Sequence, residues 1–252
     1  MFEATVRDGV LRLRRPGTRW LSTGWAGGRS RGDAAYNVSV PEGFDRTDLG
    51  AYRDERLARA GFKSEGDAGR DGDTPTLFTG VAMEHARGAR FGPVAAYATV
   101  GLSNPAMLPM YPTDAAGEPE TASDGLASAA AEGEPSPPGT VNLIVGTTRR
   151  LADGAAPNLV AVAAEAKATT LLAIAGVPGT TSDAIVVADN PEGEPAAFSG
   201  SATPVGAAAR VCVRDAVRAS LRSRYPDGDV PGPAVDAEHG VVADDRAEVF
   251  EL

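Results

Sequence analysis

The sequence has few of the residues on which common catalytic and structural sites depend. Its 252 residues include one cysteine, Cys212, and two histidines, His85 and His239. A single cysteine excludes an intrachain disulfide and is typical of a reducing compartment. Two histidines cannot build a His-rich zinc cluster, and we predict a surface position for His85. No nucleophile elbow of a serine hydrolase is predicted. Cys212 lies among apolar residues and is interpreted as a small core side chain.

Lysine is nearly absent as well. Of the 24 basic residues only Lys63 and Lys167 are lysines, and 34 acidic residues give a net charge of −10. This balance is typical of a salt-rich cytoplasm, where an acidic surface stays soluble and salt screens its self-repulsion. A GC-rich genome would also favour arginine over lysine. Because phosphate binding needs a basic face, we expect no nucleic-acid partner.

The sequence also has no uncharged apolar stretch long enough to span a membrane, and no targeting segment is recognised in it. The most apolar stretch carries two charges, which argues against a membrane span. The N-terminus has no apolar core of a signal peptide. We therefore expect a soluble, cytoplasmic protein with no membrane partner; the sequence does not indicate its oligomeric state.

That apolar stretch, residues 158–176, is predicted to be the central helix. Asn158 suits the N-cap and Gly176 the left-handed residue that ends a helix. Glu165 and Lys167 are two residues apart, so they point to different sides and cannot pair with each other. A buried charge needs a partner or a polar cavity; the alternative is a half-buried helix with both charges at its wet edge. A lone lysine here, in a chain that avoids lysine, favours a functional role for Lys167.

The remaining pattern predicts an α+β fold. Asp8-Gly9 indicates a hairpin within residues 2–14, and Thr203 an N-cap with Pro204 at the first helical position. We predict a single domain whose mixed, largely antiparallel sheet is packed by helices. The predicted strands cover 20–21, 36–40, 77–83, 93–100, 139–148, 184–188 and 196–198, and the helices cover 52–60, 158–176 and 203–224.

The domain is expected to span residues 1–225, with a flexible insert at about 113–138. Residues 226–252 are interpreted as an acidic tail, whose last residues, 249–252, are expected to dock on the domain. Neither the insert nor the tail is expected to carry chemistry.

Polar and glycine residues gather where the predicted strands meet loops. Ligands of α/β proteins collect at strand ends, and glycines let backbone N–H groups approach a ligand, although each residue alone is more often a turn or cap. The spacing matches neither a P-loop nor a dinucleotide fingerprint. The candidate binding residues are Ser22, Thr23, Gly27, Gly28, Asn37, Thr79, Asn104, Thr140, Asn142 and Ser182, and the candidate acid–base groups are Glu165, Lys167 and Asp183.

Taken together, these segments resemble the adenosylcobinamide amidohydrolases of archaeal corrinoid salvage. The resemblance covers most of residues 20–220. It departs from the family at residues 179–183, which read GTTSD where the family typically reads Gly-Thr-Gly-Thr-Asp, so Thr181 changes the backbone freedom there. The matching segments are LSTGWAGG (21–28), YNVSVP (36–41), FTGVAM (78–83), TVGLSNPA (99–106), PGTVNLIV (138–145), AAEAKATTLL (163–172), TSDAIVVA (181–188) and FSGSATPVG (198–206).

The resemblance implies hydrolysis of the amide that joins the aminopropanol arm to the corrin ring of adenosylcobinamide. The products are adenosylcobyric acid and 1-amino-2-propanol. The corrinoid is then a substrate rather than a cofactor; no cofactor and no metal ligand is predicted, although a divalent metal is not excluded. A broad cleft lined by Trp20, Trp25 and Tyr97 would suit so large a ring.

Amide hydrolysis requires a nucleophile, oxyanion stabilisation and a proton for the leaving amine. One hypothesis is direct attack by water with Glu165 as general base. Lys167, Asn142 or backbone N–H groups near Gly27 and Gly28 would hold the oxyanion, and Asp183 would orient Lys167 or the water.

A rival mechanism is covalent, with Thr140 or Ser22 as nucleophile and Lys167 as base. Two other functions stay open. A non-catalytic corrinoid carrier would bind without cleavage, and a hydrolase of a smaller amide would have a narrow pocket.

Overall fold

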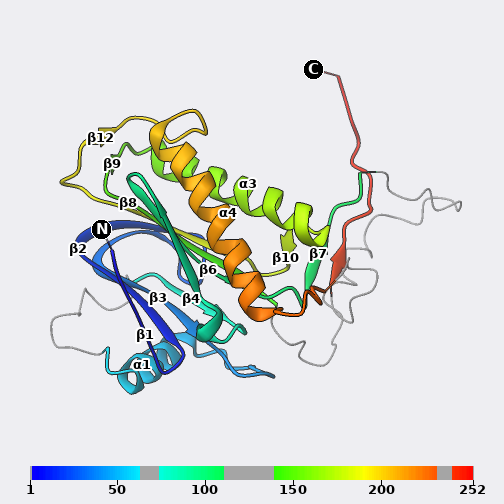
Figure 1. Cartoon of the computed structure of the whole chain (residues 1–252), viewed down its shortest axis with the longest axis horizontal. Helices are drawn as coiled ribbons and strands as arrows, with labels where there is room; N and C mark the ends of the chain where they lie inside the picture. The colour runs from blue at the N-terminus through cyan, green and yellow to red at the C-terminus, as the bar shows by residue number, and fades with distance from the viewer. Residues whose placement is uncertain (1, 63–73, 111–138, 232–239, 252) are drawn as a thin grey trace, which may run out of the picture.

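The computed structural model describes residues 2–62, 74–110, 139–231 and 240–251. The predicted insert at 113–138 lies outside the described residues. The described part has one open eight-stranded sheet, with two long helices against one face and a shorter helix beyond the opposite end (Figure 1). This arrangement confirms the predicted α+β class.

The sheet is mixed and largely antiparallel, as predicted. Its order is β4-β3-β2-β11-β8-β6-β5, and β1 pairs with β2 beside this path. Only β3–β4 and β8–β11 are parallel pairs within it. The strands are β1 (Glu3–Arg7), β2 (Val10–Ser22), β3 (Gly28–Ser39), β4 (Thr76–Thr79), β5 (Arg87–Phe91), β6 (Val94–Val100), β8 (Val141–Thr147) and β11 (Ala184–Asp189).

The predicted N-terminal hairpin is confirmed. Asp8 and Gly9 adopt φ of 45° and 71° between β1 and β2, which are the positive values of a two-residue hairpin turn. The sheet then curls strongly: Asn142 of β8 donates a 3.0 Å hydrogen bond to Asn37 of β3, although β2 and β11 separate these strands in the sheet order.

The described residues contain three α-helices: α1 (Leu49–Arg59), α3 (Ala155–Ala175) and α4 (Pro204–Arg224). The Thr203 cap is confirmed, since its hydroxyl accepts from the backbone N–H of Gly206 at 3.1 Å. The Asn158 cap is wrong, because α3 begins three residues earlier. Pro157 is tolerated in that first turn, where its missing N–H would have no partner inside the helix. Asn158 instead accepts from the Ser199 hydroxyl at 3.1 Å.

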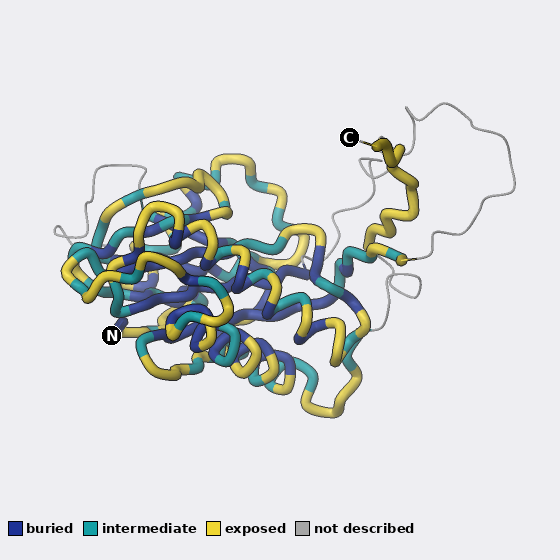
Figure 2. Tube along the Cα trace, turned by 90° about the horizontal axis from the view of Figure 1, so that it is seen from above, coloured by how far each residue is buried: buried dark blue, intermediate teal, exposed yellow. Residues whose placement is uncertain are grey.

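The main hydrophobic core fills the layer between the sheet and the two long helices (Figure 2). By length and composition α3 is the one helix in the described residues that could cross a membrane, so its two charges did not exclude a span. Its packing is that of a core helix, since Leu159, Ala163 and Leu171 are 0% exposed against the sheet and α4. A second cluster, including Trp20 and Ile144, lies inside the curl of the sheet.

Short strands form two further small sheets. β7 (Pro105–Met107) pairs with β10 (Gly179–Thr180) and with β13 (Val241–Val242), while β9 (Arg150–Leu151) pairs with β12 (Pro195–Ala196). The tail therefore joins the domain at β13. The predicted docking of residues 249–252 is wrong for Val249 and Phe250, which are 93% and 73% exposed.

One predicted strand is shorter than expected. The chain leaves β4 after Thr79, and Met83–His85 forms a 3-10 turn. His85 is only partly exposed, because its Nδ1 lies 3.1 Å from the hydroxyl of Ser223 on α4. Its side chain is 21% exposed, so the predicted surface position is confirmed in part.

Candidate functional site

The structure brings one group of predicted site residues together where the parallel strands β8 and β11 begin. The sequence Pro-Gly-Thr precedes both strands, at residues 138–140 and 178–180. The two strands run side by side, with Ala184 opposite Asn142. The turns that precede these strands therefore meet at the N-terminal ends of two central strands of the sheet. They lie beneath the C-terminal half of α3 (Figure 1).

Asp183 is the centre of this group. It forms an ion pair with Lys167 of α3, and both side chains are 12% exposed. The backbone N–H of Val141 donates to Asp183 Oδ1 at 2.9 Å, and the N–H of Thr180 donates to Oδ2 at 3.1 Å. The Thr180 hydroxyl donates to Oδ1 as well. Four donors thus occupy the roughly four acceptor positions of one carboxylate.

Two glycines let this group pack closely. A Cβ at Gly179 would collide with Asp183 Oδ2 and lie 2.7 Å from Lys167 Nζ. A Cβ at Gly139 would lie 2.5 Å from the backbone nitrogen of Asn104. Neither position has room for a side chain, so both glycines are required by the arrangement around Asp183.

Hydroxyl groups line the outer side of the same corner. The Thr140 and Ser182 hydroxyls are 3.1 Å apart; Thr140 is buried and Ser182 is exposed. Asn104 lies beside them, because its carbonyl accepts from the N–H of Thr181 at 3.1 Å. The corner therefore contains the Lys167 ammonium, which Asp183 holds in place, and two hydroxyl groups, of which that of Ser182 belongs to an exposed residue. Such an arrangement can bind and polarise a carbonyl group.

Glu165 lies apart from this corner. Its side chain is 60% exposed and accepts from Arg210 of α4 at 2.6 Å. The prediction that Glu165 and Lys167 point to different sides of the helix is thereby confirmed. The geometry gives Glu165 no contact with Lys167 or Asp183.

Asn37 and Asn142 form a second, buried polar group on the other face of the sheet. Asn37 donates to the Thr99 hydroxyl at 2.9 Å, and Asn142 donates to Asn37 Oδ1 at 3.0 Å and to the carbonyl of Phe78 at 2.8 Å. Asn142 is 1% exposed, and its Oδ1 has no hydrogen-bond partner in the described part of the chain. These amides tie β3, β4, β6 and β8 together where the sheet curls.

The predicted residues of the first glycine-rich loop are engaged in the β2–β3 turn. Ser22 Oγ accepts from the N–H of Gly24 at 3.1 Å, and Thr23 Oγ1 accepts from the N–H of Ile185 at 2.9 Å. A Cβ at Gly27 would lie 2.5 Å from the Ser22 carbonyl, and Gly28 has a φ of 114°. Thr79 has a similar local role, since its hydroxyl accepts from the Val81 N–H at 3.1 Å.

The predicted aromatic cleft is not formed as such. Trp20 is 2% exposed, inside the curl of the sheet. Tyr97 is partly buried and packs on the same cluster, and this burial raises the pKa of its phenol. Only Trp25 offers its ring to solvent, at 36% exposure, with Phe78 and Arg53 against it.

The sequence analysis missed three members of the Asp183 group: Thr180, Gly139 and Gly179. The repeated Pro-Gly-Thr before two β-branched strands was the signal that could have identified them. Among the described residues, no group of three or more His, Cys, Asp or Glu side chains could hold a metal ion. The metal and cofactor predictions stay untested.

Comparison with known proteins now adds the family. The family model described as adenosylcobinamide amidohydrolase matches residues 2–228. A relative of that name from Halobacterium salinarum is 57% identical over 250 residues, 99% of each chain. A crystal structure of a Pyrococcus horikoshii OT3 protein aligns over 88% of this chain and 79% of that chain, at 13% identity and a TM-score of 0.43, which is too low to carry an argument. The sequence matches show that the chain belongs to the adenosylcobinamide amidohydrolase family.

Proposed function

We propose that this protein hydrolyses the aminopropanol amide of adenosylcobinamide, in keeping with the description of its family as adenosylcobinamide amidohydrolase, and that the Lys167–Asp183 corner carries the reaction. The observation that supports this site is the Asp183 carboxylate, which holds an otherwise isolated lysine at a solvent-accessible edge of the sheet. The products are adenosylcobyric acid and 1-amino-2-propanol, and the corrinoid is the substrate.

Lys167 is proposed as the electrostatic catalyst. An ammonium has three donors, and the described residues supply one partner, Asp183. The two other N–H groups are available for the carbonyl oxygen, which becomes negatively charged when the amide carbon is attacked. Preorganised donors of this kind typically contribute about 10²–10³-fold to the rate.

Asp183 is proposed as a positioning residue rather than a base. Its acceptor positions are already filled by Lys167, two backbone N–H groups and the Thr180 hydroxyl. A carboxylate in that state has no free lone pair for a water proton. Its contribution is to fix the position of the Lys167 ammonium against β10 and β11.

Water is proposed as the attacking group, held by the hydroxyls of Thr140 and Ser182. Its oxygen bonds to the amide carbon, and its proton passes through these hydroxyls to the amide nitrogen, so that the C–N bond breaks and 1-amino-2-propanol leaves as the amine. In the described residues these hydroxyls bond to each other and, for Ser182, to the Gly139 carbonyl. Neither has a carboxylate or imidazole partner there that would activate it as a nucleophile. Ser22, the other predicted nucleophile, is buried and its hydroxyl is engaged by Gly24.

The test is mass spectrometry of adenosylcobinamide incubated with the purified protein at high salt. Adenosylcobyric acid and aminopropanol are the expected products of the wild type. Lys167→Met should lose most of this activity, while Glu165→Gln should retain it. Binding without cleavage by a folded wild-type protein would favour a corrinoid carrier, and cleavage of simple amides alone would favour a smaller substrate. A trapped acyl-enzyme would favour covalent attack by a hydroxyl.

The remaining assignments belong to the same proposal. We propose a cytoplasmic protein that acts without nucleic acid or membrane and needs no organic cofactor. The single buried cysteine supports a reducing compartment, and the acidic composition supports a salt-rich one. Activity measured after chelation and after addition of divalent cations tests whether a metal assists.

A further inference from the structure

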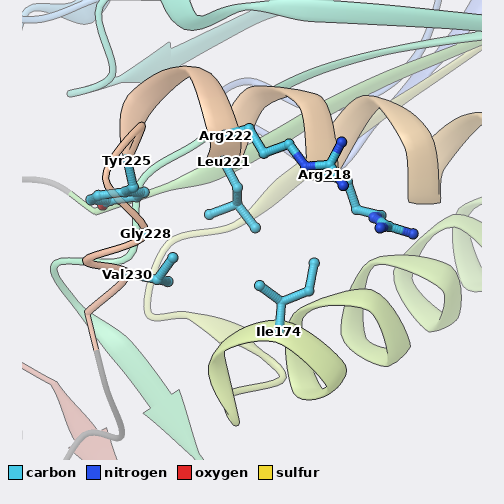
Figure 3. A pocket seen from close by; sticks show the side chains of 7 residues that line it. All are labelled: Ile174, Arg218, Leu221, Arg222, Tyr225, Gly228 and Val230. Carbon is cyan, nitrogen blue, oxygen red and sulfur yellow. The ribbon is translucent and has the colours of Figure 1, made fainter.

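The groove between the C-terminal ends of α3 and α4 contains a cavity that the amide-hydrolysing site does not use. The cavity has a volume of about 440 Å³ and lies at the C-terminal ends of the two helices. Figure 3 shows Ile174 of α3 facing Leu221 of α4, with Val230 closing one end. Ile174 is 42% exposed there, so an apolar surface is open to solvent.

Arginines of α4 line this groove. Arg210, Arg214, Arg218 and Arg222 recur every fourth residue, and residues at that spacing lie on one face of a helix. Arg210 pairs with Glu165 and Arg214 pairs with Asp215. Arg218 and Arg222, which line the cavity, form no salt bridge within the described residues. The groove is thus basic and apolar in a protein whose net charge is −10.

The C-terminal tail has the complementary chemistry. Residues 243–251 contain four acidic side chains against one arginine, and they include Val249 and Phe250. All nine residues are exposed. After β13 the tail runs outward, away from the body of the domain (Figures 1 and 2). An exposed apolar pair at the end of an acidic segment indicates that the tail binds to another surface.

We propose that the tail of one chain binds in the α3–α4 groove of a second copy. Val249 and Phe250 fill the apolar cavity between Ile174 and Leu221, and the neighbouring acidic residues Glu248 and Glu251 pair with Arg218 and Arg222. Two reciprocal exchanges produce a closed, two-fold symmetric dimer. The inference does not depend on the proposed hydrolytic function, because none of the residues that line the cavity belongs to the Asp183 group.

A second copy suits the described geometry better than the tail's own groove. The tail leaves β13 in a direction that carries its C-terminal end away from its own domain. Arm exchange needs no change in that direction, whereas binding within one chain requires the tail to reverse its course.

The test is analytical ultracentrifugation of the full chain over a range of protein and salt concentrations. We expect a monomer–dimer equilibrium for the wild type. Deletion of residues 243–252 should give a monomer. Phe250→Ala should raise the dimer dissociation constant about tenfold or more, because it removes a large apolar side chain from the interface. Phe198→Ala is the matched control, since Phe198 is 75% exposed elsewhere, and it should leave the constant unchanged.

A mixing experiment establishes that the contact joins two chains. The variant Arg218→Glu/Arg222→Glu retains its tail and loses the groove, while the 243–252 deletion retains the groove and loses its tail. Each alone should be monomeric, and the mixture should form a dimer held by one tail. Arg31→Glu/Arg90→Glu carries the same charge change on strands away from the groove and should dimerise normally.

Two outcomes would overturn the proposal. A dimer that is indifferent to the deletion, to Phe250→Ala and to the groove variant would have a different interface. A wild-type monomer would also overturn it; if hydrogen exchange then showed the tail protected and released by Arg218→Glu/Arg222→Glu, the occupant would be the chain's own tail. Normal hydrolysis by the monomeric variants would leave the hydrolytic proposal intact.

Discussion

Lys167 and Glu165 are separated by one residue on α3, yet their surroundings differ completely. Lys167 points toward the sheet, is 12% exposed and pairs with a carboxylate that backbone N–H groups hold in place. Glu165 points toward the outer groove, is 60% exposed and pairs with an arginine that is itself 37% exposed. The comparison shows that the effect of an ion pair depends on the structure around it. Exposed pairs contribute at most about 1 kcal/mol to the free energy of unfolding.

Replacing Asp183 should have the largest effect. Asp183→Ala leaves Lys167, two backbone N–H groups and the Thr180 hydroxyl without their acceptor. Loss of one partner of a buried pair costs about 3–5 kcal/mol of unfolding free energy. Chemical denaturation should report a loss of this size, together with loss of turnover. Asp153→Ala is the control, because its side chain is 95% exposed; an equal loss there would mean that the Asp183 network adds nothing.

Lys167→Met should affect catalysis more than stability. Asp183 keeps three of its donors, so the fold is retained, but the positive charge at the site is lost. We expect kcat to fall by about 10²-fold or more with the native circular dichroism spectrum preserved. Lys167→Arg should not restore activity, because a planar guanidinium cannot present its donors as a compact ammonium does. Full activity of either variant would remove Lys167 from the mechanism.

Gly179→Ala tests whether the close packing of the ion pair matters. The added methyl group collides with Asp183 and approaches Lys167 Nζ to 2.7 Å, so the pair must separate. Overpacking of this kind costs about 1–3 kcal/mol, and we expect a lower melting temperature and a reduced kcat. Gly154→Ala adds the same methyl group where nothing lies within 4 Å and should behave as wild type. If both variants behave alike, Gly179 has no special role.

Glu165→Gln should have the smallest effect. The exposed pair with Arg210 contributes about 0–1 kcal/mol, and the side chain has no contact with the Asp183 corner. Turnover within about twofold of wild type is expected from a pair of such small energy. Loss of turnover in a folded Glu165→Gln protein would restore the hypothesis that this carboxylate is the general base.

Much of the fold could be predicted from local patterns. The Asp8-Gly9 hairpin, the Thr203 cap and the Gly176 terminus follow from backbone preferences that neighbouring residues decide. The errors occurred where packing decides. Pro157 permits an earlier helix start, and the curl of the sheet buries Trp20, which alternation alone cannot reveal.

The candidate site was only partly predictable. The isolation of Lys167 among apolar residues identified it correctly as a side chain that needs a partner, and Asp183 stood among the candidates. The network that joins them depends on β8 and β11 lying side by side and parallel. That pairing connects residues about 40 positions apart, so no local pattern could distinguish Thr180 and Gly179 from ordinary turn residues.

The sequence by itself determined the family, the α+β class and the fact that Glu165 and Lys167 diverge, because helical spacing fixes the angle between neighbouring side chains. Only the tertiary structure decided which of the two charges is buried and paired. That choice depends on which face of α3 meets the sheet, and it is set by the burial of Leu159, Ala163 and Leu171 against strands distant in the sequence. The same packing leaves Ile174, at the C-terminal end of α3, exposed beside α4 and its arginines.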